Sequence, residues 1–134
     1  DRHSRAALAP PIDHPERPTF LRWMLFMSSV LYPAVLRRYY AERYTTDAAS
    51  SGAVADAALD EFERAFDVID AHLQASDWFC ASRSIADVYL LMMQTWHPDD
   101  DLVRIKWPNI ERVAASLRAD PAIRALNEYY DMWT

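Results

Sequence analysis

The sequence predicts an all-α domain, and three observations lead to this fold class. Only one glycine occurs in 134 residues, although tight β-hairpin turns depend on glycine for positive φ angles. Apolar residues recur every three or four positions through five segments, which is the period of an amphipathic helix. Ser84 and Asp87 have the spacing of an N-capping box, directly before the uncharged run 88–93. We therefore expect a five-helix bundle around a central buried helix.

The first predicted helix covers residues 16–44. Pro33 lies in its middle and lacks the N–H that a helix uses there, so a kink is expected. The uncharged part, from Trp23 to Leu36, is shorter than the ~20 residues that cross a bilayer, and no membrane association is expected. The apolar stripe consists of Phe20, Trp23, Met24, Met27, Leu31, Val35 and Tyr39.

The second predicted helix covers residues 54–75 and follows a loop over residues 45–53. Charged residues, mostly acidic, occupy one side of it and predict a solvated face. The opposite, apolar side consists of Val54, Ala58, Phe62, Phe66, Ile69 and Leu73.

The capping box opens the third predicted helix, over residues 85–96. The Ser84 hydroxyl can accept from the N–H three residues on, and the Asp87 carboxylate can accept from the N–H of Ser84. The residues that follow are apolar on every side, which is typical of a helix surrounded by other helices. We expect Asp87→Ala to cost ~0.5–2 kcal/mol as the loss of a cap, measured by chemical denaturation.

Two further helices are predicted to close the chain. Pro108 and Pro121 begin them at the first helical position, which proline favours. Between the third and fourth helices, Asp99-Asp100-Asp101 is predicted to be a solvent-exposed loop. The apolar residues of the two helices are Ile110, Val113, Ala114 and Leu117, and then Ile123, Leu126, Tyr130 and Trp133.

Charge and cysteine content narrow the function classes. The net charge of −6 argues against a nucleic-acid-binding surface, which needs a basic footprint. A single cysteine, Cys80, cannot form a disulfide within the chain, and no secretory signal is visible, so a reducing, cytoplasmic setting is expected. Because Cys80 follows Trp78 and Phe79, it is interpreted as a small buried hydrophobic residue rather than a nucleophile.

No pattern in the sequence predicts a catalytic residue or a metal site. The four histidines share no ligand spacing with cysteine or acidic residues, and no glycine-rich phosphate loop is present. Aromatic and methionine side chains remain, and they either belong to the core or line an apolar pocket. Tyr32 and Trp96 are the strongest pocket candidates because each lies beside a proline break or a helix end. The full set is Met24, Met27, Tyr32, Trp96, Tyr129 and Trp133.

Five short motifs, in order along the chain, resemble the C-terminal helical domain of bacterial cytosolic glutathione transferases. Cys80-Ala81-Ser82 departs from that pattern where the family usually has glycine, and Arg83 replaces the hydrophobic residue before the cap. The five motifs are Leu8-Ala9-Pro10-Pro11, Arg22-Trp23 with Leu31-Tyr32-Pro33, residues 84–90, residues 107–110 and residues 120–123.

The resemblance implies that residues 1–12 are the end of a thioredoxin-like domain plus a linker, and that residues 13–134 are the helical domain. The thioredoxin-like domain would bind and activate glutathione, so this chain alone should be inactive. The helical domain would form the wall of a pocket for a small apolar electrophile, within a homodimer. By this resemblance Tyr32 and Trp96 line the pocket, and Met27 is added to them from the set of aromatic and methionine candidates.

The resemblance also implies that Ser29 approaches glutathione across the dimer, although Val30 lacks the carboxylate that some relatives carry there. Two alternatives remain open at this stage. One is a non-enzymatic interaction or scaffold module with the same fold. The other is an isomerase or dehalogenase of the same superfamily, because the fold does not fix the reaction.

Overall fold

The structure is a computed structural model that describes residues 8–130, and this part of the chain consists of helices and their connecting loops. The predicted all-α class is therefore confirmed. Residues 1–7 of the segment 1–12, which was predicted to be the end of a preceding domain plus a linker, lie outside the described residues, as does Trp133 of the last predicted helix.

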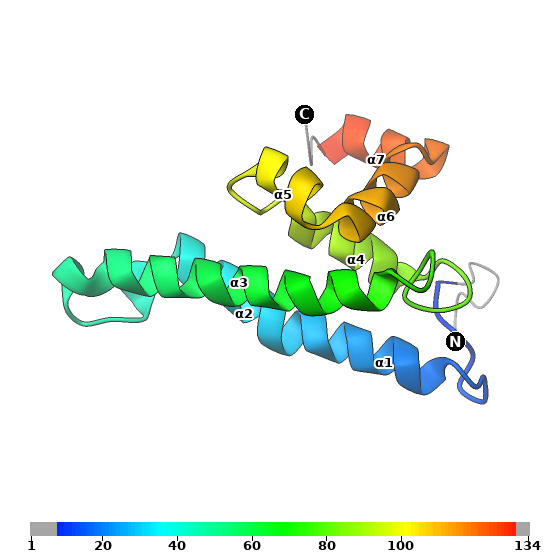
Figure 1. The fold of residues 1–134 in the computed structure, drawn as a ribbon, viewed down its shortest axis with the longest axis horizontal. Coiled ribbons are helices and arrows are strands. Elements are labelled where there is room, and N and C mark those ends of the chain that lie inside the picture. The colour runs from blue at the N-terminus through cyan, green and yellow to red at the C-terminus, as the bar shows by residue number, and fades with distance from the viewer. Residues whose placement is uncertain (1–7, 131–134) are drawn as a thin grey trace.

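A long antiparallel helical pair forms the base of the molecule (Figure 1). Its first member joins α1 (Arg17–Phe26), a π-helical turn (Met27–Leu31) and α2 (Tyr32–Tyr39), and its second member is α3 (Ser51–Leu73). The four remaining helices pack over one part of this pair, and the connected ends of α2 and α3 extend beyond them. They are α4 (Ile85–Gln94), α5 (Asp100–Lys106), α6 (Pro108–Arg118) and α7 (Pro121–Tyr130).

The π-helical turn lies directly before Pro33, where the sequence predicted a kink. Proline cannot donate a backbone hydrogen bond, and the turn widens so that the N–H of Tyr32 donates to the carbonyl of Met27, five residues back. Such single wide turns insert one extra residue into an α-helix. The register of α2 relative to α1 is therefore shifted. The first predicted helix also ends earlier than expected, at Tyr39, and a 3₁₀ turn (Ala41–Arg43) follows it.

Helix α3 fixes the start of α6 through its acidic side. One oxygen of Asp70 accepts hydrogen bonds from the backbone N–H groups of Asn109 and Ile110, at 2.8 and 3.0 Å. The other oxygen accepts from the side-chain amide of Asn109 at 2.9 Å. The first N–H groups of a helix have no partner inside that helix, so Asp70 caps α6 from a different helix. The predicted solvated face of α3 thus includes a residue with a structural role.

Helix α5 was not predicted, because the sequence assigned Asp99-Asp100-Asp101 to a loop. In the structure Asp99 is the N-cap of α5, and its carboxylate accepts from the N–H of Leu102 at 2.8 Å. Asp100 and Asp101 form the first turn, where acidic side chains favour the positive end of the helix dipole. The three aspartates therefore start a helix.

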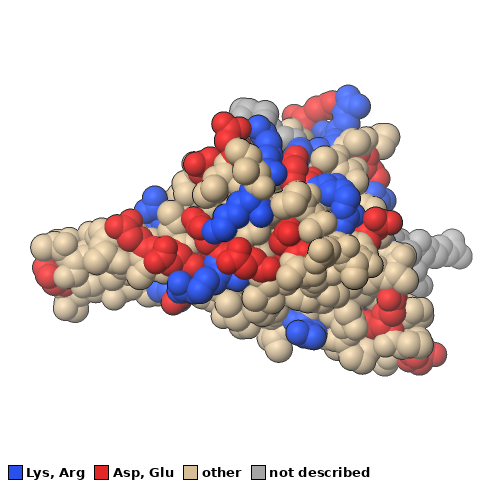
Figure 2. Space-filling model, in the orientation of Figure 1, with Lys and Arg blue, Asp and Glu red and all other residues tan. Residues whose placement is uncertain are grey.

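On the face shown in Figure 2, acidic and basic side chains are interspersed over α3, α5 and α6, and much of the remaining surface is uncharged. Several of them are paired, including Lys106 with Glu63 at 2.8 Å and Arg112 with Asp77 at 3.2 Å. This face offers no continuous basic patch for a polyanion.

By length and composition, one helical stretch among the described residues, Arg17–Tyr39, could cross a membrane, with a mean hydropathy of 1.3 over 18 residues. Core helices of water-soluble proteins pass the same test, and 33% of that window is buried in this fold. Trp23, Met27 and Leu31 of this stretch belong to the hydrophobic core.

Candidate groove between α4, α1 and α7

An apolar groove of about 660 Å³ lies between α4, α1 and α7. Helix α4 supplies most of it from one side, while the opposite side of α4, with Leu90 and Met93, is fully buried in the core. The helix expected to be surrounded on all sides is therefore covered on one side and borders a groove on the other. The lining residues are Met24, Ile85, Val88, Tyr89, Leu91, Met92, Thr95, Trp96, Ile123 and Leu126.

The capping box fixes the N-terminal end of α4, as the sequence predicted. Asp87 is fully buried, and its Oδ2 accepts from the N–H of Ser84 at 2.7 Å and from the Ser84 hydroxyl at 3.1 Å. Its Oδ1 accepts from the N–H of Phe79 at 3.0 Å. Burial raises the pKa of Asp87, and these hydrogen bonds act in the opposite direction. Asp87 therefore ties the preceding loop to the helix as well as capping it.

Residues 8–10, which belong to the predicted linker, are held against this same end of α4. The N–H of Ile85 donates to the carbonyl of Leu8 at 2.7 Å, and the Arg17 guanidinium donates to the carbonyl of Pro10 at 2.7 Å. Ile85 also lines the groove. The start of the described chain therefore lies beside one end of the groove.

At the other end of the groove, Trp96 is held from two directions. The phenol of Tyr39 donates to the Trp96 carbonyl at 2.6 Å, which joins the end of α2 to the residues that follow α4. The ring of Tyr32 lies against the Trp96 ring, with centroids 6.0 Å apart. Two aromatic residues of α2 thus contact Trp96, one at its backbone carbonyl and one at its ring.

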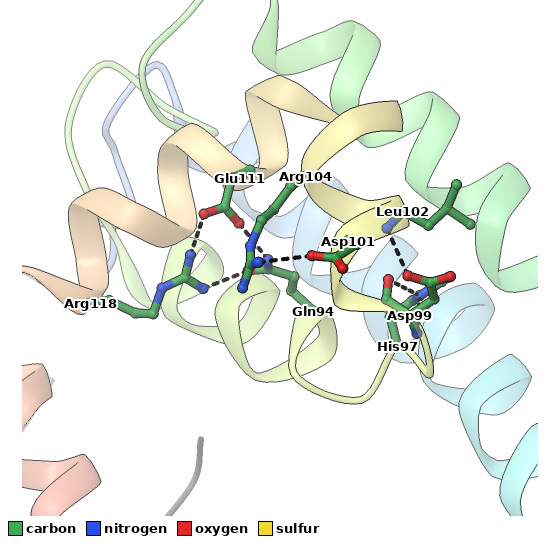
Figure 3. Close-up of polar contacts among 8 residues, drawn as sticks. All are labelled: Gln94, His97, Asp99, Asp101, Leu102, Arg104, Glu111 and Arg118. Atoms are coloured by element: carbon green, nitrogen blue, oxygen red, sulfur yellow. Dashed lines mark hydrogen bonds and ion pairs between the residues drawn. The ribbon is translucent and has the colours of Figure 1, made fainter. Parts of the chain in front are cut away.

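A polar cluster lies behind this end of α4 and joins it to α6 (Figure 3). The side-chain amide of Gln94 donates to Glu111 at 2.8 Å and accepts from Arg118 at 3.2 Å, and Arg118 and Glu111 form an ion pair at 2.5 Å. Gln94 is 4% exposed, and both the nitrogen and the oxygen of its side-chain amide have hydrogen-bond partners. Buried polar groups that are satisfied in this way add rigidity.

His97 follows the groove residue Trp96 and is buried among Phe62, Phe66 and Trp107. Its Nδ1 accepts from the N–H of Asp99 at 3.1 Å. Its Nε2 is buried without a hydrogen-bond partner among the described residues. Burial lowers the pKa of His97, so the ring is neutral at neutral pH.

The predicted pocket residues differ in whether their side chains reach the groove. Trp96 lines the groove, and Tyr32 supports Trp96 without being one of the lining residues. Met27 is fully buried in the core and does not reach the groove, and Met24, which precedes it by three residues, lines the groove instead.

Ser29 is exposed, and its hydroxyl donates to the carbonyl of Leu25 at 2.7 Å. This is a local bond within the first helical stretch. The contact with glutathione that the resemblance implies stays a prediction.

No cysteine or metal chemistry is evident in residues 8–130. Burial raises the pKa of Cys80 to about 11, so its thiol is protonated at neutral pH and is a poor nucleophile. No group of three histidine, cysteine, aspartate or glutamate side chains in this part of the chain could hold a metal ion.

Comparison with known proteins relates this arrangement to one group. No family model matches the chain. The uncharacterised GST-like protein YncG of Escherichia coli (strain K12) is 25% identical over 121 residues, which are 90% of this chain and 58% of YncG. Among solved structures, the bacterial glutathione S-transferase (GST) BphK, in a ternary complex, superposes with a TM-score of 0.80 at 19% identity, over 96% of this chain and 62% of BphK.

A glutathione transferase homologue from Sulfitobacter, with bound glutathione, superposes with a TM-score of 0.82 at 17% identity, over 97% of this chain and 69% of that one. The chain has a glutathione transferase-like helical fold. It spans less than two thirds of the length of YncG and of BphK.

Sequence reasoning missed several groove residues of this glutathione transferase-like domain, among them Ile85, Val88, Tyr89, Ile123 and Leu126. A signal for the α4 members does exist, because residues 85, 88, 89, 92 and 96 recur every three or four positions and share one face of a helix. That face could not be separated from the core face, since both are apolar.

Proposed function

We propose that this chain is the helical domain of a glutathione transferase, and that its groove forms the wall of a hydrophobic electrophile pocket. The intact protein would conjugate glutathione to small apolar electrophiles. The observation that supports this most is the apolar groove, which lies along α4 and ends at Trp96. A concave, mainly apolar site with a few polar groups is the usual form of a small-molecule pocket.

In this proposal glutathione is bound mainly by a thioredoxin-like domain that precedes the chain, and Ser29 contacts glutathione. The Sulfitobacter homologue, which has a similar helical fold, was determined with glutathione bound. The helical domain then contributes by holding the electrophile close to the glutathione thiolate, which raises the rate through proximity. We further propose that the intact protein is a cytoplasmic homodimer.

A binding experiment on the chain tests the pocket. A neutral apolar fluorophore, N-phenyl-1-naphthylamine, is titrated into the 134-residue chain. We expect binding that Trp96→Ala weakens by about tenfold, because a large aromatic contact surface is lost. Tyr32→Ala should also weaken binding, because Tyr32 supports Trp96. Tyr44→Ala, which removes an exposed aromatic side chain outside the groove, is the matched control and should leave binding unchanged.

The same chain tests the division of labour between domains. It should not conjugate glutathione to a standard aromatic electrophile at an enzyme-like rate, and such activity in the isolated chain would contradict the proposal. Two alternatives predict other outcomes. An interaction or scaffold module should fail to bind the fluorophore. An isomerase or dehalogenase of the same fold should bind it, while the intact protein shows that other reaction.

A further inference from the structure

The groove has few polar side-chain atoms, and these come from α4 and from the two residues that follow it. Among its lining residues only Tyr89, Thr95 and Trp96 carry side-chain oxygen or nitrogen atoms. The Thr95 hydroxyl already donates to the carbonyl of Met92 at 2.8 Å. Two hydrogen-bonding groups are left for a ligand, the Tyr89 hydroxyl and the Trp96 indole N–H.

Neither group has a hydrogen-bond partner within residues 8–130, and both side chains are partly exposed. Tyr89 lies in α4, and Trp96 lies two residues beyond the last residue of that helix, so the two side chains line different parts of the same groove. Met92, between them, also lines the groove. An apolar strip therefore carries one unsatisfied donor at each end.

The chemistry of these groups favours one kind of ligand atom. An indole N–H only donates, and a protonated phenol is a good donor. Burial raises the pKa of Tyr89, and the nearby Tyr32 phenol raises it further, so Tyr89 keeps its proton at neutral pH. None of the lining residues has a charged side chain, so a charged ligand group would lose its hydration without gaining a counter-charge.

We propose that Tyr89 is a specificity-determining residue of the groove, whose hydroxyl donates a hydrogen bond to a carbonyl or nitro oxygen on a neutral aromatic ligand. The aromatic body of the ligand lies along Met92 and against Trp96, and the conjugated oxygen lies at Tyr89. This inference rests on the proposed function, because it assumes that the groove takes a small molecule. It adds the requirement that the ligand has an acceptor oxygen.

Two probes of nearly identical shape separate the hydrogen bond from apolar burial. 2-Acetylnaphthalene has a carbonyl oxygen where 2-isopropenylnaphthalene has a methylene group. Their dissociation constants are measured with the full chain and with Tyr89→Phe, which keeps the ring and removes the hydroxyl. We expect Tyr89→Phe to weaken the ketone about three- to tenfold, as for the loss of one hydrogen bond, and to leave the hydrocarbon unchanged within twofold.

Tyr44→Phe removes an exposed hydroxyl outside the groove and should change neither affinity. An infrared measurement provides a second test, because the carbonyl stretch of the bound ketone should lie at lower frequency in the wild-type chain than in Tyr89→Phe. Equal effects of Tyr89→Phe on both probes, or no effect on either, would overturn the role of Tyr89 and leave the groove in place. If neither probe binds the wild-type chain, both the inference and the proposed pocket are wrong.

Discussion

At the scale of single residues, Asp87 carries more structure than a helix cap usually does. A capping box satisfies N–H groups at the start of its own helix, but Asp87 also accepts from the N–H of Phe79, eight residues earlier. Removing the carboxylate would leave the N–H groups of Phe79 and Ser84 without acceptors in a buried site. The loop over residues 79–84 and the first turn of α4 therefore depend on one side chain.

Because Asp87 also accepts from the N–H of Phe79, we expect Asp87→Ala to lower the free energy of unfolding by ~2–4 kcal/mol, which is more than the ~0.5–2 kcal/mol expected from the sequence for the cap alone, since buried N–H groups are left unsatisfied. Ser84→Ala removes only the hydroxyl and should cost ~0.5–2 kcal/mol. Chemical denaturation measures both, with Asp13→Ala as an exposed control. If Asp87→Ala and Ser84→Ala have equal effects, the hydrogen bond to Phe79 contributes nothing measurable.

His97 gives the stability of the protein a specific pH dependence. Burial among aromatic rings lowers its folded-state pKa below the ordinary value of 6.5. As the pH falls through that value, the unfolded chain binds a proton at this residue before the folded chain does, so the free energy of unfolding decreases. The decrease stops once the pH lies below the folded-state pKa. The stability that neutral His97 contributes is therefore fully present above the unfolded-state pKa and is lost below it.

The measurement compares the free energy of unfolding at about pH 8 and about pH 5, on either side of the unfolded-state histidine pKa. His97→Phe should reduce the difference between these two values, whatever its effect on stability at a single pH. His14→Gln alters an exposed histidine and should preserve the difference. An unchanged difference in His97→Phe would mean that other groups cause the acid sensitivity.

At the scale of helices, the α3–α6 contact depends on a cap supplied by another helix. Asp70→Ala should lower the free energy of unfolding by ~1–3 kcal/mol, because the N–H groups of Asn109 and Ile110 lose their acceptor. Asp56→Ala, at an exposed position of the same helix, should change stability by less than ~0.5 kcal/mol. Equal effects of the two substitutions in chemical denaturation would show that the Asp70 cap is not important.

The helices that could be predicted from the sequence are those whose signals are local. The starts of α4, α6 and α7 follow from Ser84, Pro108 and Pro121, because caps and proline act within one turn. Helix α5 could not be predicted because it is short and has a single buried residue, Val103. A seven-residue helix gives no readable apolar period.

The residues of the groove also divide into those with a local signal in the sequence and those whose position depends on how the helices pack. That Trp96 borders a groove could be predicted because it lies at a helix end. Which of Met24 and Met27 reaches the groove could not be predicted, because the answer depends on how α1 is rotated against α4. Cys80 was interpreted correctly as a buried side chain, since its aromatic neighbours in the sequence indicate a core segment.

At the scale of the whole molecule, α1 to α6 share one hydrophobic core, and α7 contributes no buried residue to it. The buried residues of that core come from the first six helices and the segments between them, whereas no residue of α7 is buried. Ile123 packs against the core, and Leu126 is 47% exposed. Elements with few buried apolar contacts open at lower free energy than the rest of a domain.

We therefore expect the backbone amides of α7 to exchange with deuterium at a lower opening free energy than those of Leu90 and Met93 in α4. Since Ile123 and Leu126 form one wall of the groove, a ligand bound there should slow exchange in α7 more than in α3. Native-state hydrogen exchange with and without N-phenyl-1-naphthylamine measures both effects. Equal protection of α7 and α4 without ligand would contradict the first expectation, and a ligand that left α7 exchange unchanged would show that α7 is not part of the binding wall. The groove would then be complete with α4 and α1 alone, and its apolar ligand would have to lie along Met24 and Met92.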